Sequence, residues 1–555
     1  MNTLAFPPFP ATKFRSGIDW VEQEWYDTQR PFSDFDFVEQ VFGVKKEHVN
    51  TTIRIFSVAR QLGFQSLLKE ELSGDNSLKR EEDDRVRKID LDFNKSKIYR
   101  FSFFACPVDQ YPKQDDFLGY AVIKADYYDY YRDQPTPHIY VYESVLAPNH
   151  PEHICQSDKQ LEYCKRNFLH CQRKYEIETI LGVFSVTGAM YAQQNGRNFV
   201  CSHVALRSVL SLFCADDISY DEIDRLAGRP CYSREGLTPE QINIILKGKG
   251  VIARCISREQ FSELGVSSYS PVLYGYVESG CPSLLAFFPR GGTVGHIVPV
   301  LGHTFDADSW VPEARNGYFA GSGGYFSSEG WLDSFIIHDD NFGPYKTLPR
   351  NYLMEEGDIF LWGLDTDAAA LCFEKMEAAT IGVCWDFIRK NGGRHRPDFT
   401  WYNRFLHCAN EGKLILRSLF INREHYIRQI EENIEFEKFE KGHLDWLRLH
   451  LPDKLWMVEL SCRELFSAAR SKFGEVLLAV GDVDEKFNSS YIPLILRLPG
   501  VVHFYPADST YKTALFYRTP LFFRNNMVSE AESLYPEYSD TEIAQTGQET
   551  GLLAR

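Results

Sequence analysis

The sequence predicts an α+β protein that contains more than one domain. Its 555 residues exceed what one ordinary hydrophobic core holds, which indicates two to four domains. Some segments repeat apolar residues at helical spacing, whereas others are rich in Tyr, Phe, Val and Ile and are interrupted by Pro and Gly, as strands are. A hydrophobic content of 44% and a charged content of 25% are typical of a folded globular protein. These observations favour a chain of mixed helices and strands.

The composition argues against several classes of protein. A formal net charge of −17 is the opposite of the basic surplus of nucleic-acid-binding proteins, so no nucleic-acid partner is expected. No apolar run approaches the roughly 20 residues of a membrane span, and the first residues lack the apolar core of a secretory signal. The 13 cysteines are odd in number and irregularly spaced, which favours reduced thiols over disulfides. We therefore expect a cytoplasmic protein without a membrane partner.

The first third of the chain changes its pattern once. Residues 1–95 are expected to be mixed and mostly helical, because segments such as 52–72 repeat apolar residues at helical spacing. Residues 96–184 are expected to be rich in strands, because aromatic and β-branched residues dominate segments such as 117–126. The change of period predicts two separate regions.

Cysteines and histidines also gather near the end of the strand-rich region. A zinc site there would be built on Cys155, Cys164 and Cys171, with His153 and His170 nearby. Zinc sites usually contain tight pairs such as Cys-x2-Cys, and these gaps are irregular. We therefore expect neither a metal nor a cofactor, and keep the zinc protein as an alternative that elemental analysis would test.

The C-terminal part is divided into three segments after a central block at 185–350. Residues 351–394 are expected to form a helical connector, 395–527 an α/β unit and 528–555 a disordered tail. The size and aromatic content of the regions that flank the central block suggest that they shape substrate access or bind a protein partner.

Cys201 lies at the expected start of a helix in the central block. Apolar residues from Val204 to Phe213 occur on more than one face, so this helix is expected to be buried nearly all round. Free N–H groups and the positive end of the helix dipole favour a thiolate at this position and can hold an oxyanion. The alternative is a buried, inert thiol.

A nucleophilic cysteine needs a base and a group that orients the base. His296 follows a Gly-rich turn and begins a short apolar strand, and His303 near the end of that strand competes for the role of base. A later strand ends at Asp339, whose carboxylate could accept a hydrogen bond from the histidine. Asp340 and Asn341 follow directly, so the identity of the orienting residue stays open.

Three segments then occur in an informative order: QQNGRNFVCSHVAL, GHIVPVLGHTFD and FIIHDDNFGPY. A cysteine at a helix start, a Gly-His pair on a strand and a strand that ends in Asp resemble the motifs of papain-like cysteine peptidases. They are most similar to those of the bacteriocin-processing peptidases that remove double-glycine leaders. The resemblance covers residues 185–350. It implies a papain-like core, in which an N-terminal helix is followed by an antiparallel sheet.

The resemblance also implies roles for individual residues. Cys201 would be the nucleophile, His296 the general base, and Asp339 the residue that orients His296. Gln194 would contribute its side chain to the oxyanion hole together with the backbone N–H of Cys201, with Gln193 as an alternative. The resemblance implies no cofactor and no metal.

The expected reaction is acyl transfer from a peptide or isopeptide bond to Cys201, followed by hydrolysis of the thioester. A protein or peptide substrate is therefore expected. The alternative is a catalytically silent papain-like fold that binds peptides or acts as a scaffold, because Ser202 stands where Gly is usual and could narrow access to the thiol. The same site could also perform deamidation or acyl transfer to an amine.

Overall fold

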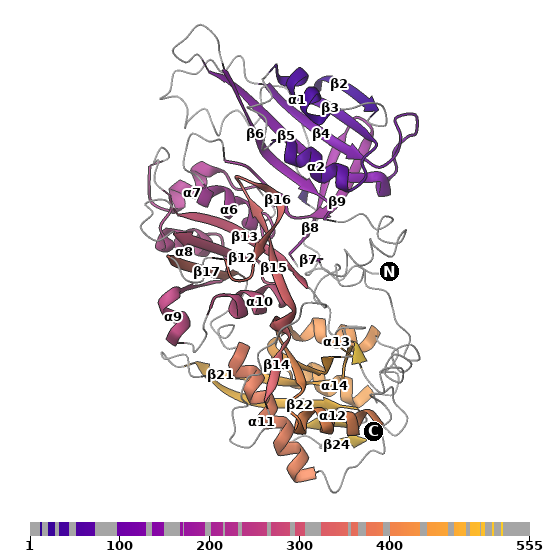
Figure 1. Ribbon diagram of the computed structural model, residues 1–555, viewed down its shortest axis with the longest axis vertical. Helices are drawn as coiled ribbons and strands as arrows, with labels where there is room; N and C mark the ends of the chain where they lie inside the picture. Colours follow the sequence, from indigo (N-terminus) through magenta and orange to yellow (C-terminus); the bar gives the residue numbers. More distant parts are fainter. Residues whose placement is uncertain are drawn as a thin grey trace.

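The protein is α+β in this computed structural model, and three units follow one another along its long axis (Figure 1). The N-terminal unit contains most of the described residues before the helix that starts at Cys201, the central unit contains that helix and its sheet, and the C-terminal unit contains most of the described residues after 372. The structure describes residues 12–13, 20–27, 33–43, 52–72, 97–128, 136–148, 167–169, 171–194, 201–214, 217–230, 236–263, 268–288, 295–305, 324–352, 357–364, 373–391, 400–432, 441–463, 465, 471–483, 489–499, 501–505, 513–515 and 523–524.

A six-stranded antiparallel sheet forms the centre of the N-terminal unit, with the strand order β10-β6-β5-β4-β3-β2. Strands in the middle of the sheet are buried on both faces, because elements of the same unit cover each face. The strands are β2 (Trp20–Asp27), β3 (Ser66–Leu72), β4 (Lys97–Phe104), β5 (Phe117–Tyr128), β6 (Thr136–Leu146) and β10 (Met190–Tyr191).

Two helices pack on one face of this sheet and a hairpin packs on the other. Successive side chains of a strand point to opposite faces, so Phe101 and Phe103 contact the helices, whereas Phe104 packs edge-to-face on Phe184 of the hairpin, with the ring centroids 5.2 Å apart. The helices are α1 (Asp34–Phe42) and α2 (Thr52–Gln61). The hairpin consists of β8 (Arg173–Thr179) and β9 (Gly182–Gly188), and β1 (Thr12–Lys13) pairs with β8 in parallel.

The expected division near residue 95 is wrong, because β3 pairs directly with β4 across it, in the register Leu67 with Phe103. The helix expected over 52–72 is also shorter than predicted. It ends at Gln61, Gly63 turns the chain with a φ of 83°, and the rest of the segment is β3. Because β3 is buried on both faces, its apolar residues do not alternate, and a strand of this kind cannot be told from a helix by periodicity.

The central unit contains a seven-stranded antiparallel sheet in the order β11-β17-β12-β13-β15-β16, with β7 paired to β13. Its β17 lies between β11 and β12, so the sheet extends beyond the expected end of this block at residue 350. The prediction of a helical connector over 351–394 is therefore wrong for residues 358–364, which form β17. The strands are β7 (Asn167–Leu169), β11 (Ala253–Ser257), β12 (Ser283–Phe288), β13 (His296–Phe305), β15 (Leu332–Asp339), β16 (Gly343–Pro349) and β17 (Asp358–Leu364).

Helices cover both faces of the central sheet. Leu284 and Ala286 of β12 pack toward α6, α7 and α8, whereas Leu285 between them packs toward α10. The side with α10 shares one hydrophobic core with the C-terminal unit. The helices are α6 (Cys201–Leu210), α7 (Tyr220–Leu226), α8 (Pro239–Gly248), α9 (Arg258–Glu263) and α10 (Ser270–Glu278).

A second seven-stranded sheet forms the C-terminal unit, with the order β14-β18-β19-β21-β22-β23-β24. It is antiparallel except that β14 pairs with β18 in parallel. The strands are β14 (Tyr325–Ser327), β18 (Leu414–Asn422), β19 (Lys454–Ser461), β21 (Gly474–Val483), β22 (Ser489–Leu498), β23 (Val501–Phe504) and β24 (Thr513–Leu515), and β20 (Ser471–Lys472) pairs separately with β25 (Phe523–Arg524).

The helices of the C-terminal unit lie on opposite faces of its sheet. The first two pack into the core shared with the central unit, and the last two cover the other face. They are α11 (Phe373–Asn391), α12 (Thr400–Asn410), α13 (Arg423–Glu432) and α14 (Lys441–His450). The expected disordered tail at 528–555 lies outside the described residues. Among the described residues, no helix has both the length and the apolar character needed to cross a membrane.

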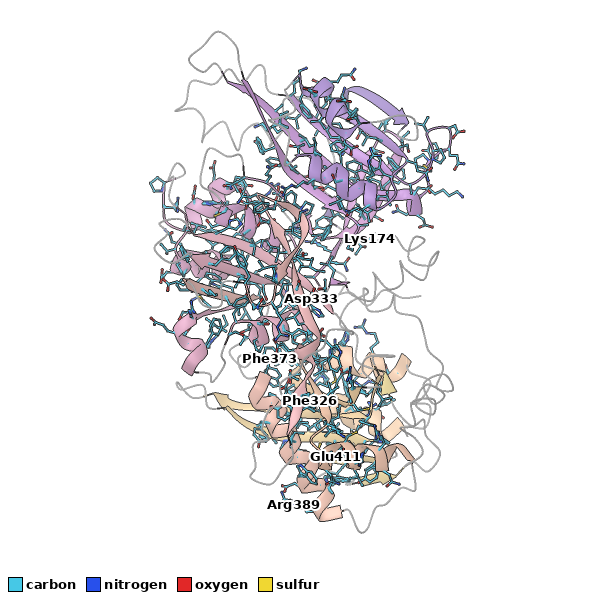
Figure 2. The ribbon with its side chains drawn as sticks, viewed as in Figure 1. Lys174, Phe326, Asp333, Phe373, Arg389 and Glu411 are labelled. Atoms are coloured by element: carbon cyan, nitrogen blue, oxygen red, sulfur yellow. The ribbon has the colours of Figure 1, made fainter. Side chains whose placement is uncertain are left out.

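Aromatic side chains fill the junction between the central and C-terminal units. Phe373, at the start of α11, packs edge-to-face on Tyr276 of α10 and on Trp456 of β19, with ring centroids 5.7 and 4.9 Å apart (Figure 2). Gly275 makes room for this ring, because a Cβ atom there would lie 2.6 Å from it. The central and C-terminal units therefore share one hydrophobic core.

A chain of buried charged side chains crosses the same junction. His303 of β13 is paired with Glu278 of α10, and Glu278 also accepts from Arg417 of β18, whose Nε lies 2.6 Å from its Oε2. Arg417 Nη1 continues to Glu459 Oε2 at 3.1 Å, and Lys472 Nζ lies 2.7 Å from Glu459 Oε1. All five side chains are at most 1% exposed. We name this set the buried charge chain.

The buried charge chain continues to Glu475, which gives a pH-dependent prediction. Lys472 Nζ lies 2.5 Å from one carboxylate oxygen of Glu475, and Arg497 Nη1 lies 2.7 Å from the other. Burial raises the pKa of Glu475, but Arg497 and Lys472 outweigh burial and lower the pKa to about 2. A lowered pKa stabilises the folded state above the usual value of 4.5, and this stabilisation is lost as the pH falls toward 2.

We therefore expect Glu475→Gln to lower the free energy of unfolding at pH 7 by about 3–5 kcal/mol, the usual cost of breaking a buried ion pair. The difference from the wild type should shrink steadily between pH 4.5 and pH 3, as measured by urea denaturation at each pH. A difference that stays constant over this range would contradict the assignment.

Candidate active site

The fold brings together Cys201, His296 and Asp339, which lie on three elements distant in sequence. Cys201 is the first residue of α6, His296 is the first residue of β13, and Asp339 is the last residue of β15. Because β13 and β15 are antiparallel neighbours, the start of one and the end of the other lie at the same edge of the sheet. Helix α6 packs across β13, which brings the N-terminus of the helix to this edge.

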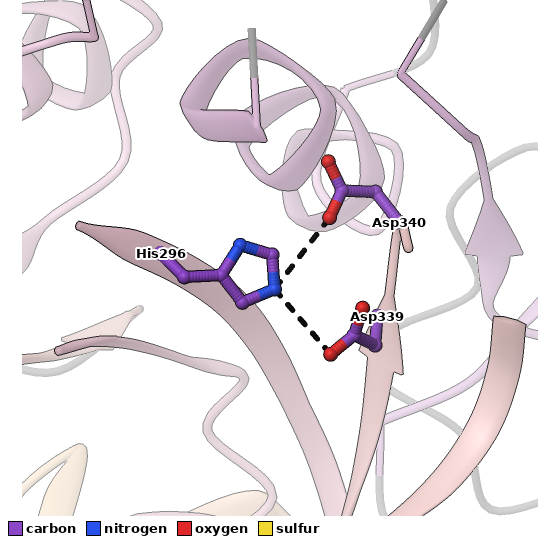
Figure 3. Close-up of side chains that lie close together, drawn as sticks. All are labelled: His296, Asp339 and Asp340. Atoms are coloured by element: carbon purple, nitrogen blue, oxygen red, sulfur yellow. Dashed lines mark hydrogen bonds and ion pairs between the residues drawn. The ribbon is translucent and has the colours of Figure 1, made fainter. Parts of the chain in front are cut away.

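His296 contacts both a thiol and a carboxylate. Its Nε2 lies 3.3 Å from Asp339 Oδ2 and 3.6 Å from Asp340 Oδ1. Dashed lines mark both contacts in Figure 3. The side chain of Cys201 makes a further hydrogen bond with the imidazole. The ring packs edge-to-face on Phe287 of β12, with the centroids 5.5 Å apart, and only 20% of the side chain is exposed. These contacts fix the imidazole between the thiol and two carboxylates.

The environment of His296 favours the protonated imidazolium. Burial alone lowers its pKa, but hydrogen bonds with Asp339 and Cys201 and the negative charges of Asp340 and Asp339 outweigh burial and raise the pKa to about 10. The imidazole therefore carries a proton at neutral pH. An imidazolium beside a thiol stabilises the thiolate, which is the nucleophilic form of cysteine.

Asp339 is held in place by the turn that follows it. Its Oδ1 accepts hydrogen bonds from the backbone N–H of Asn341 at 2.8 Å and of Phe342 at 3.0 Å, which leaves Oδ2 for His296. Burial raises the pKa of Asp339, but the hydrogen bond and charge of His296 and the two backbone donors lower it overall. Asp339 is thus ionised and fixed, as a residue that orients an imidazole must be.

Asp340 differs from its neighbour although it faces the same imidazole. The residue is 5% exposed, and neither of its carboxylate oxygens has a hydrogen-bond partner. Burial raises its pKa to about 6, since the attraction of His296 only partly offsets burial and the repulsion of Asp339 adds to it. Asn341, the third candidate from the sequence, instead contacts Gln194 through its side chain. Among the three candidates, Asp339 alone has the short contact with His296.

The two glutamines before Cys201 have different surroundings. Gln193 is buried, and both its backbone N–H and its side-chain oxygen bond with the backbone of Val141 in β6, at 2.9 and 3.1 Å. Its side chain therefore belongs to the N-terminal sheet. Gln194 is half-buried, and its Nε2 donates to Asn341 Oδ1 at 2.6 Å. Of the two, Gln194 lies beside the turn that carries Asp339.

The residue after the nucleophile candidate points away from the site. Ser202 is buried, and its Oγ accepts a hydrogen bond from the backbone N–H of Leu237 at 3.2 Å. His203 is also buried and contacts Asp224 of α7 through Nε2 at 2.7 Å. His303, the competitor of His296 for the role of base, is fully buried in the charge chain. The buried contacts of these three residues, Ser202, His203 and His303, thus indicate structural roles.

Two buried residues behind the carboxylates were missed in the sequence. Tyr191 of β10 is 2% exposed and its hydroxyl has no hydrogen-bond partner; burial and the charges of Asp340 and Asp339 raise its pKa. His338 lies against the ring of Tyr191, and burial lowers the pKa of His338 to about 3, so this imidazole is neutral. Neither residue carries a local signal, because strand β10 is only two residues long and His338 lies inside a buried strand.

Most residues of the alternative zinc site from the sequence lie outside the described residues. Cys155 and Cys164 are not described, whereas Cys171 is a buried free thiol whose pKa is raised by burial. Nine cysteines are described, and all nine are free thiols.

The comparisons with known proteins give no relative from which a role could be transferred. No protein-family model, no curated protein and no solved structure matches this chain. The assignment of a function therefore depends on the geometry around Cys201, His296 and Asp339.

Proposed function

We propose that the protein is a papain-like cysteine peptidase that cleaves a peptide or isopeptide bond with Cys201, His296 and Asp339. The observation that carries the proposal is the position of the His296 ring, which contacts the Cys201 thiol and the Asp339 carboxylate together. A nucleophile, a base and a group that orients the base are the three parts that this chemistry requires.

The proposed acylation step starts from a thiolate and an imidazolium. Since Nε2 of His296 faces the carboxylates, Nδ1 is the nitrogen left for the thiol. The sulfur attacks the carbonyl carbon of the scissile bond, and Nδ1–H donates its proton to the nitrogen that leaves as an amine. Asp339 stabilises the imidazolium until the proton is transferred. The products of this step are a thioester on Cys201 and a free amine.

The proposed oxyanion site lies at the N-terminus of α6. Peptide N–H groups in the first turn of a helix have no partner within the helix, so that of Cys201 can donate to the developing oxyanion. The Gln194 side chain is the second donor in this proposal, and its contact with Asn341 ties it to the turn of Asp339. In deacylation His296 accepts a proton from water, and the resulting hydroxide attacks the thioester.

The N-terminal unit is positioned to limit access to this site. Arg54 of α2 donates to the backbone carbonyl of Phe342, on the turn that follows Asp339, and also lies over the Phe342 ring at 5.3 Å. Phe342 is 57% exposed. An exposed aromatic ring beside the proposed catalytic turn is suited to contact an apolar side chain of a peptide substrate.

The proposed location is the cytoplasm, because its reducing conditions keep a reactive thiol in the reduced form.

Selective alkylation tests the activated thiol without a known substrate. We expect iodoacetamide at pH 7 to modify Cys201 at least about 10-fold faster than Cys255, because a thiolate reacts and a thiol does not. Cys255 is the matched control, since it is also a half-buried thiol of the central unit and burial raises its pKa to about 12. Mass spectrometry of tryptic peptides over time gives both rates.

The variant His296→Ala should remove the advantage of Cys201 over Cys255. If Cys201 in the wild type reacts no faster than Cys255, the thiol is not activated, and the catalytically silent, peptide-binding alternative is preferred. Deamidation and transfer to an amine would use the same thiolate, so the identity of the products, not the alkylation rate, separates them from hydrolysis.

A further inference from the structure

Three ligand atoms converge on one side of the His296 ring. Nε2 of His296 lies 3.3 Å from Asp339 Oδ2 and 3.6 Å from Asp340 Oδ1, and all three atoms lie within 4.8 Å of one another. Within the described part of the chain, no other group of three His, Cys, Asp or Glu side chains brings its ligand atoms this close. Figure 3 shows that both carboxylates point toward Nε2, from the end of β15 and from the turn after it.

A second observation indicates that this group is incomplete without a ligand. Asp340 is 5% exposed, yet neither of its oxygens has a hydrogen-bond partner. The nearby Tyr191 hydroxyl is also buried and also without a partner. Two buried carboxylates repel each other, and one imidazole shared between them compensates this repulsion only in part.

The two distances from His296 Nε2 fit a transition-metal site, and the two carboxylate oxygens lie within 4.8 Å of each other. An ion that binds nitrogen and oxygen at about 2.0–2.1 Å in tetrahedral geometry separates its ligands by about 3.4 Å. The two nitrogen–oxygen distances of 3.3 and 3.6 Å are close to this value. A set of one imidazole and two carboxylates suits Zn²⁺ and related divalent ions, since Ca²⁺ takes six to eight oxygen ligands.

We propose that His296, Asp339 and Asp340 bind a divalent transition-metal ion such as Zn²⁺, and that the bound ion inhibits the thiol site. The binding part stands on the geometry of these three residues, whereas the inhibition part rests on the proposed peptidase function. A fourth ligand would be water.

The inhibition follows from which ring nitrogen the ion uses. The ion takes the lone pair of Nε2, and the proton of this nitrogen passes to solvent. The remaining proton then stays on Nδ1, so His296 can neither form the imidazolium that pairs with the Cys201 thiolate nor accept a proton from water in deacylation. The base of the proposed reaction is therefore lost while the ion is bound.

Direct binding measurements test the site independently of catalysis. We use the full chain with Cys201→Ala, so that no active-site thiol can bind metal, and measure Zn²⁺ affinity by competition with a chromophoric chelator. Asp340→Asn in this background is expected to weaken binding at least about 10-fold, the usual effect of losing a metal ligand or its close partner. The variant should fold, because Asn has nearly the same shape as Asp and neither carboxylate oxygen of Asp340 makes a hydrogen bond.

Asp358→Asn is the matched control. Asp358 is exposed at the start of β17, at the same sheet edge as His296, but is not part of the group. It should leave the Zn²⁺ affinity unchanged. Equal affinity in Asp340→Asn and in its parent would overturn the site. Binding that is strong in the wild type but absent in Cys201→Ala would also overturn it, because the ion would then be bound by the thiolate.

Alkylation of Cys201 in the otherwise wild-type protein tests the inhibition. Zn²⁺ is expected to slow the reaction at least about 10-fold, EDTA should restore it, and Asp340→Asn should make it less sensitive to Zn²⁺. If Zn²⁺ binds as predicted but leaves fast alkylation unchanged, the inhibition is wrong. If alkylation is slow with or without Zn²⁺ although the ion binds, the proposed peptidase function is wrong and the metal site stands.

Discussion

Cys201→Ala is expected to abolish peptide cleavage, with a loss of at least about 10³-fold in turnover. Without the sulfur no thioester can form, and His296 and Asp339 alone cannot supply a nucleophile that replaces it. The remaining activity should be no more than that from substrate binding and the oxyanion site. This is the largest effect that the proposed mechanism predicts for one side chain.

The measurement is a mixed peptide library incubated with the protein, in which new N-termini are identified by mass spectrometry. Cleavage by the wild type that disappears in Cys201→Ala, and persists in the control Cys255→Ala, supports the nucleophile. Cys255 is half-buried in β11 of the same unit and does not contact His296. Cleavage that persists in Cys201→Ala would show that another group, or a contaminant, performs the reaction.

Arg417→Met is expected to lower the free energy of unfolding by about 3–5 kcal/mol, the usual cost of removing one partner of a buried ion pair. Arg417 is 1% exposed and connects Glu278 of the central unit with Glu459 of the C-terminal unit. Its loss leaves two carboxylates buried at the junction with only His303 and Lys472 to compensate them.

The matched control is Arg389→Met on α11. Arg389 is also an ion-paired arginine, 3.6 Å from Asp386, but its side chain is 68% exposed (Figure 2). Exposed pairs contribute about 0–1 kcal/mol, so this variant should be nearly neutral. Urea denaturation followed by tryptophan fluorescence gives both values. Equal stability of the two variants would show that the buried charge chain does not hold the units together.

Three residues of the site could be predicted from sequence, because each lies at the start or end of a helix or strand that the local sequence indicates. Cys201 precedes a helix, His296 follows glycines at the start of a strand, and Asp339 ends a strand before a turn, and the structure brings these three together. The distinct role of Asp340 could not be predicted, because it depends on whether backbone N–H groups reach its carboxylate. The N–H groups of Asn341 and Phe342 donate to Asp339 Oδ1.

The α+β class could be predicted, but the pairing of strands between distant segments could not. The change of period near residue 95 suggested a boundary, yet β3 and β4 on either side of it are neighbours in one sheet. Similarly, β17 lies in the segment that was expected to be a helical connector, yet it pairs with β11 and β12 in the central sheet. His303 looked like a candidate base because its partner Glu278, on α10, is recognisable only in three dimensions.

The buried charge chain limits where recombination can divide the gene of this protein. A gene segment that ends before Arg417 would encode the site but leave Glu278 paired with His303 alone, and a segment that begins at β18 would encode Arg417 without Glu278. Neither half could be exchanged by recombination with an unrelated neighbour without first losing charges on both sides. We therefore expect the gene segments for the central and C-terminal units to be inherited together. Related chains should keep both units, in this order.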